Sequence, residues 1–173
     1  KKVTVHGKVE ARILPFPSVT MNDVRVGQDI DGSPIVQIER FSMDAELAPF
    51  LSGEARIFDM RIDKPKARVR VLADGRLDWM RGSAPAVPAK TVVLENVKIT
   101  GGSIEFIDAQ SGRVRQVTGL DAAMSAHSLA GPWRVEGSAA VDGEKGRFTL
   151  STTELADKAP GLGLRAKIIP QAH

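Results

Sequence analysis

Hydrophobic residues recur at every second position through most of this chain, and this period constrains the fold more than any other feature. Val3, Val5, Val9 and Ala11 already alternate with polar residues in the first run. Alternate side chains of a strand point to opposite faces of a sheet. Because similar runs continue as far as residues 162–168, the sequence predicts a mainly β protein whose sheet has one apolar face.

The alternation changes phase by one residue at Asn22-Asp23, at Glu39-Arg40 and at Glu95-Asn96. A one-residue slip would turn every later side chain to the wrong face. A β-bulge at each point restores the facing and adds bend and twist. We therefore predict a curved sheet with bulges at these three positions.

Turn signals separate the apolar runs and predict hairpins between neighbouring strands. Their spacing predicts a long curved antiparallel meander that forms a β-groove or an open sandwich. The signals are Asp31-Gly32, Asp74-Gly75, Gly101-Gly102, Ser111-Gly112 and Asp142-Gly143.

Helix signals are scarce, and we expect one or two short helices. The best candidate is Ala48–Gly53, where Pro49 suits a first helical position and Gly53 suits a left-handed cap. Residues 83–90 are rich in Pro and Ala and predict a connector. The chain therefore divides into a β unit at 1–82, this connector, and a second β unit at 91–173 that continues the same sheet.

A short pattern occurs three times, with Asp or Asn followed by an apolar residue, a basic residue and another apolar residue. Its first positions are Asp23, Asp59 and Asn96, which are 36 or 37 residues apart. A period of this size is typical of stacked structural units. The alternative is that strand and turn chemistry recurs in any meander.

The residue types that most catalytic and metal sites need are scarce. The chain has three His, no Tyr and no Cys, which excludes disulfides, thiolate metal sites and a Cys nucleophile. His6 falls on the polar phase of a strand, His127 follows an apolar run, and His173 is the last residue. We predict no catalytic residue, no metal site, no cofactor and no enzymatic activity.

The charges are mixed along the chain, with 24 Lys and Arg against 21 Asp and Glu, and a net charge of +3. This balance does not predict a nucleic-acid partner. Lys64, Lys66, Arg68 and Arg70 occupy alternate positions of one predicted strand. We interpret them as a solvated outer face that protects an edge strand, the alternative being attraction to anionic lipid headgroups.

Few helices are available to cover the apolar sheet face, which must be buried by a second sheet, by closure into a barrel, or by a bound apolar ligand. An exposed apolar groove usually marks a binding surface. We predict that the groove is lined by Val9, Ile13, Met21, Val24, Phe41, Met43, Met60, Val69, Val97 and Phe106.

Four segments, taken in order and with their spacing, resemble the AsmA family. Residues 12–27 are similar to that family's entry strand and first hairpin, and residues 47–57 to its short helix and following strand. The next hairpin corresponds to residues 62–70 leading to 74–79, and the start of a repeat to residues 93–106. The resemblance covers most of residues 1–150.

The resemblance implies an elongated β-groove that carries phospholipid acyl chains, as in the related TamB-type and chorein-type bridge proteins. It implies a location at the periplasmic face of the inner membrane of a Gram-negative bacterium, with membrane contact through an N-terminal anchor that this sequence lacks. The implied role is outer-membrane biogenesis and lipid homeostasis. The alternative is a scaffold for outer-membrane protein assembly, which pairs its edge strands with envelope proteins.

Overall fold

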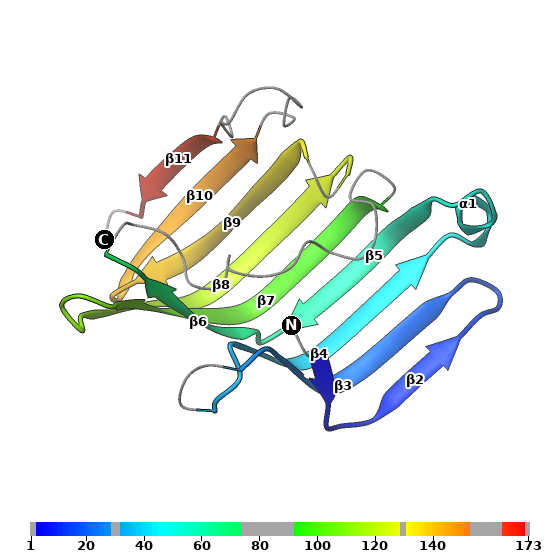
Figure 1. Cartoon of the computed structure of the whole chain (residues 1–173). Helices are drawn as coiled ribbons and strands as arrows, with labels where there is room; N and C mark the ends of the chain where they lie inside the picture. The colour runs from blue at the N-terminus through cyan, green and yellow to red at the C-terminus, as the bar shows by residue number, and fades with distance from the viewer. Residues whose placement is uncertain (1–2, 29–31, 74–91, 129–130, 153–163, 172–173) are drawn as a thin grey trace.

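A computed structural model describes residues 3–28, 32–73, 92–128, 131–152 and 164–171. Its strands lie side by side in one layer (Figure 1) and form a single 11-stranded sheet. The elements are β1 (Val3–Val5), β2 (Val9–Arg12), β3 (Ser18–Val26), β4 (Val36–Ala45), α1 (Leu47–Leu51), β5 (Ala55–Asp63), β6 (Lys66–Val71), β7 (Val92–Asp108), β8 (Val114–Ala126), β9 (Trp133–Val141), β10 (Glu144–Thr152) and β11 (Leu164–Pro170).

The prediction of a mainly β fold with very little helix is confirmed. The strand order is β1-β3-β4-β5-β7-β8-β9-β10-β11, while β2 pairs with β3, and β6 pairs with both β4 and β7. The predicted connector at 83–90 and the turn signal Asp74-Gly75 lie outside the described residues, as does Asp31.

The sheet is mixed, which corrects the expectation of a purely antiparallel meander. Both β5 and β6 run parallel to β7, whereas all other strand pairs are antiparallel within the described chain. Parallel neighbours need a connection of about a dozen residues or more. Residues 72–91, which separate β6 from β7, are long enough for one.

The parallel pairing aligns two copies of the internal repeat. Met60 lies opposite Val97 and Arg61 opposite Lys98, an offset of 37 residues in each pair. The first positions of these copies also touch, because Asn96 Nδ2 donates to Asp59 Oδ1 at 3.1 Å. The third copy lies on β3, so the repeated pattern occupies three strands of the same sheet.

A line of left-handed residues crosses the sheet and marks a crease. Asp23 on β3, Lys64 between β5 and β6, Gly101 on β7 and Gly119 on β8 have φ values between 47° and 62°. The residues immediately before them on β3, β5 and β7 lie in one row of register partners, which passes through Arg40 on β4. Each left-handed residue shifts the alternation by one position, so apolar side chains return to the same face beyond the crease.

The three predicted bulges have different outcomes. The change at Glu95-Asn96 is confirmed by a shift of register between β7 and β8. Those at Asn22-Asp23 and Glu39-Arg40 face each other on β3 and β4, so this pair keeps its register. Gly101-Gly102 is not a hairpin turn as predicted, because the left-handed Gly101 bends β7 without ending it.

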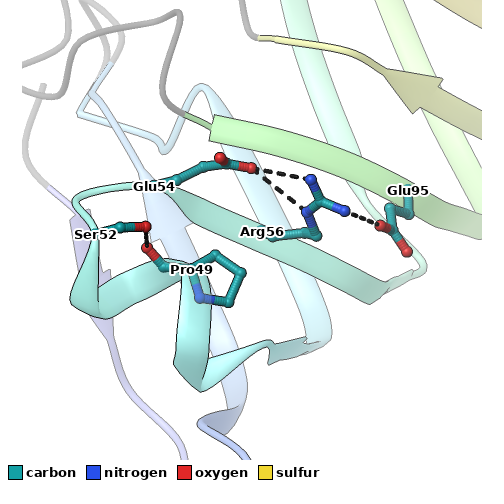
Figure 2. Close-up of polar contacts among 5 residues, drawn as sticks. All are labelled: Pro49, Ser52, Glu54, Arg56 and Glu95. Carbon is teal, nitrogen blue, oxygen red and sulfur yellow. Dashed lines mark hydrogen bonds and ion pairs between the residues drawn. The ribbon is translucent and has the colours of Figure 1, made fainter.

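Two predicted turns and the short helix are confirmed. Residues 109–113 connect β7 to β8, and Asp142-Gly143, both with positive φ, connect β9 to β10. Gly53 follows α1 with a φ of 84°. Figure 2 shows the exit of this helix, where Ser52 Oγ donates to the Pro49 carbonyl at 2.8 Å.

Polar contacts at the start of β5, just after the helix, join β5 to β7 (Figure 2). The Arg56 guanidinium lies 3.2 Å from Glu54 and 3.5 Å from Glu95 on β7. The hydrogen bond to Glu54 raises the pKa of Arg56 above its usual value. An arginine is charged in any case at physiological pH, and its contacts link the two parallel strands at the start of their pairing.

A substitution at Gly137 on β9 tests how closely β8 approaches β9. A Cβ atom there would lie 2.2 Å from the Asp121 carbonyl oxygen, so Gly137→Ala requires the backbone to move. We expect a loss of about 1–3 kcal/mol in the free energy of unfolding, measured by urea denaturation. Gly146→Ala is the control, because its Cβ meets nothing closer than 3.4 Å. Equal stability of the two variants would contradict the described register.

A substitution at Asp23 tests whether its ion pair with Arg25 stabilises the crease. The Arg25 guanidinium donates to both carboxylate oxygens of Asp23, and this holds the pKa of the carboxyl below its usual value. The stabilisation is present above the carboxyl's unfolded pKa and is lost as pH falls through its lowered folded pKa. We expect Asp23→Asn to lower the unfolding free energy at pH 7, with the deficit shrinking below about pH 4. Denaturation across that range measures it, and a deficit independent of pH would contradict the assignment.

Candidate functional site

Two continuous rows of apolar side chains cross the sheet on one face. Register partners on adjacent strands point to the same side of a sheet, so each row can be followed from β2 to β11. The first row consists of Val9, Met21, Phe41, Ile62, Ile99, Ala122, Gly137, Phe148 and Ile168. The second consists of Ala11, Val19, Met43, Met60, Val97, Met124, Val135, Leu150 and Ala166.

The apolar face continues across the crease. Strand β9 alternates without a break and pairs Gly137 with Ala122 on one side of the crease and Val141 with Val117 on the other. Val117 in turn pairs with Ile104, the neighbour of Ala67 on β6. Apolar residues on both sides of the crease therefore belong to one surface.

The opposite face is polar. The row beside the first apolar row consists of Glu10, Thr20, Ser42, Arg61, Lys98, Ala123, Glu136, Thr149 and Lys167. The sheet therefore separates an apolar surface from a charged one, as the alternation predicts.

No second layer of described strands packs on the apolar face, because all eleven belong to one sheet and α1 lies at the ends of β4 and β5 (Figure 1). Large side chains near the margins of this face are exposed, and most of those on the interior strands are half-buried. The exposed fraction is 54% for Val9, 46% for Val141 and 72% for Ile168. An exposed apolar surface that extends over many strands is typical of a binding surface.

Nine of the ten predicted groove residues lie on this face. Val9, Met21, Phe41, Met43, Met60 and Val97 belong to the two rows, and Val24, Val69 and Phe106 lie beyond the crease. Ile13 follows the end of β2 and is 72% exposed, outside both rows.

Three of these nine are buried. Val24, Val69 and Val97 have exposed fractions of 3%, 7% and 0%. Val97 lies in the packed centre of the sheet with Ile57, Leu94 and Ala126. These side chains support the surface, whereas a ligand on it would contact their more exposed neighbours.

An apolar hollow lies on this face, and Phe106 is the one predicted groove residue in its lining. Its volume is about 780 Å³, and the residues around it come from β7 to β11. The alternation of β8 to β10 could have identified the other residues of this lining, because it continues the same apolar phase past Phe106. Its apolar lining includes Val117, Ala139, Val141, Phe148, Leu150 and Ile168.

Two charged side chains stand on the apolar face at one end of this hollow. Arg115 is the register partner of Phe106 and Glu144 that of Val141, and both line the hollow. Within the described chain, Arg115 makes no ion pair. A cation beside an apolar hollow suits a ligand that has an apolar body and an anionic head.

Asp108 has a structural role in a turn. The Asp108 carboxylate accepts from Ser111 in the β7–β8 turn, which lowers the pKa of Asp108 below its usual value. His6 and His127 are exposed. The described residues contain no group of three or more His, Cys, Asp and Glu that could hold a metal ion. No helix in the described ranges is both long and apolar enough to cross a bilayer.

Comparison of the chain with protein-family models and with curated proteins finds no match.

Proposed function

We propose that this protein binds phospholipid, with the acyl chains lying along the apolar face of the sheet and the headgroup at its watery margin. The observation that carries the proposal is the pair of apolar rows that cross nine strands without a polar interruption. Binding needs no chemical step, and the proposed function is non-enzymatic.

The dimensions of the face suit hydrocarbon chains. Nine strands at about 4.8 Å spacing give each row a path of roughly 38 Å along the curved sheet. The two opposed acyl layers of a bilayer core together span only about 30 Å. Burial of apolar surface is worth roughly 25 cal/mol per Å², so a chain that lies along a row gains affinity without a specific pocket.

The side chains of the rows also suit a ligand of irregular shape. Met21, Met43 and Met60 occupy the neighbouring strands β3, β4 and β5 on the apolar face, and Met124 lies on the same face of β8. The unbranched and polarisable methionine side chain repacks readily around different apolar groups. This composition supports binding of lipids with varied acyl chains.

The resemblance to the AsmA family supplies the proposed setting. In this proposal the sheet is one section of a longer groove at the periplasmic face of the inner membrane, where it conducts phospholipid in support of outer-membrane biogenesis.

The alternative function, a scaffold that recruits envelope proteins, rests on the outer edge of β11. Among the described strands, β11 pairs only with β10. A free edge explains strand addition by a partner, but it gives no reason for apolar rows on all the other strands. Lipid binding accounts for both the interior strands and their exposed side chains, and we favour it for that reason.

The double variant Val141→Asp/Ile168→Asp tests lipid binding. Both residues line the apolar hollow and are largely exposed, so new carboxylates there perturb the surface more than the core. We expect at least a tenfold loss of bound phospholipid in native mass spectrometry after incubation with phosphatidylcholine vesicles, because each charge must be desolvated under an acyl chain.

The matched control is Ala140→Asp/Thr149→Asp, which adds the same charge to the polar face of β9 and β10. This control should load lipid like the wild-type protein. Equal loading of both double variants, or a folded wild-type protein that takes up no phospholipid, would contradict the proposed function.

A further inference from the structure

Charge is balanced by ion pairs on the strands near the N-terminus. These pairs join Arg25 to Asp23, Arg56 to Glu54, Arg61 to Asp59, Lys64 to Glu39, and Arg68 to Glu105. Two members of the basic series on and before β6, Lys64 and Arg68, are among them. That series is therefore partly neutralised by neighbouring carboxylates.

The polar face of β9 to β11 has a different charge pattern. Its cations are Arg134, Lys145, Arg147, Arg165 and Lys167, and we call this set the basic face. Glu136 is the single acidic residue on the same face of these three strands. No ion pair joins any of the five cations to another described residue.

An apolar side chain is exposed among these cations. Ile169 is the register partner of Arg147, and its exposed fraction is 51%. Arg165 and Lys167 are on its own strand and face. Cationic and apolar side chains together suit the interface of an anionic bilayer, where the cations meet phosphates and the apolar group enters the headgroup boundary.

The same face lacks the features that favour nucleic acid. Sequence-tolerant binding of single strands uses aromatic side chains on which bases stack. The aromatic residues of β9 and β10 are Trp133 and Phe148, and their register partners Ala126 and Gly137 place them on the apolar face.

We propose that the basic face docks the sheet on an anionic phospholipid bilayer, through phosphate contacts of its cations and insertion of Ile169. This surface is on the opposite side of the sheet from the apolar rows. Docking therefore does not depend on the proposed binding of acyl chains, and a docked sheet keeps its apolar face away from that bilayer surface.

The test is flotation of the protein with phosphatidylcholine vesicles that contain or lack phosphatidylglycerol. We expect binding only to the vesicles with phosphatidylglycerol, and weaker binding as salt is added, because screening shortens the reach of surface charges. Arg147→Glu/Lys167→Glu should weaken the partitioning at least tenfold, since each basic side chain contributes a several-fold gain near an anionic surface.

The matched control is Arg12→Glu/Arg113→Glu, which makes the same change of net charge at exposed positions outside the basic face. It should retain most of the binding, and so should Val141→Asp/Ile168→Asp, whose substitutions lie on the apolar face. Circular dichroism establishes that each variant is folded.

Three results would overturn the proposal. They are a wild-type protein that ignores phosphatidylglycerol, equal losses in the two double charge reversals, and a preference for single-stranded DNA over vesicles that the Arg147→Glu/Lys167→Glu variant loses. The last result would assign the basic face to nucleic acid.

Discussion

The whole structure depends on keeping apolar side chains on one face of a sheet that bends. The alternation of the sequence changes phase by one residue at the crease, and in a regular strand this change would place valines and isoleucines among the charges of the other face. Left-handed residues at one level of β3, β5–β6, β7 and β8 prevent this, because they shift the strands together. Two are Asp23 and Lys64, whose side chains bond to Arg25 and Glu39. The crease thus combines curvature with an unbroken apolar surface.

Repetition extends the same surface. The parallel register of β5 and β6 with β7 keeps an offset of 37 residues on both sides of the crease. Each left-handed position and apolar residue of one repeat therefore lies beside its counterpart in the next. A sheet built this way lengthens its apolar face with every added strand, whereas a closed core reaches a fixed size. This growth by addition is consistent with a groove for extended ligands and with one polar face that is free to meet another surface.

Local patterns in the sequence predicted much of this arrangement. Alternation identified the strands and the shared face of residues such as Met21 and Met60, and a phase change located the bulge near Glu95. The Gly101-Gly102 pair was interpreted as a turn because glycine serves equally in a hairpin and in a bend within a strand. The parallel pairing of β5 with β7 joins segments far apart in the chain, and no local pattern reports it. Alternation also assigns the same phase to Val9 and Val97, although their exposed fractions are 54% and 0%.

Photo-crosslinking from two adjacent residues of β10 tests most directly whether the apolar face receives hydrocarbon. A photoreactive phenylalanine analogue replaces either Phe148, which lines the apolar hollow, or Thr149, whose register partners Glu136 and Lys167 mark the polar face. The lipid is phosphatidylcholine, to which the basic face is not expected to bind. After incubation with it and irradiation, we predict a mass increase of one phospholipid for the Phe148 substitution and none for the Thr149 substitution. Equal labelling at the two positions, or labelling at Thr149 alone, would contradict the one-sided lipid surface.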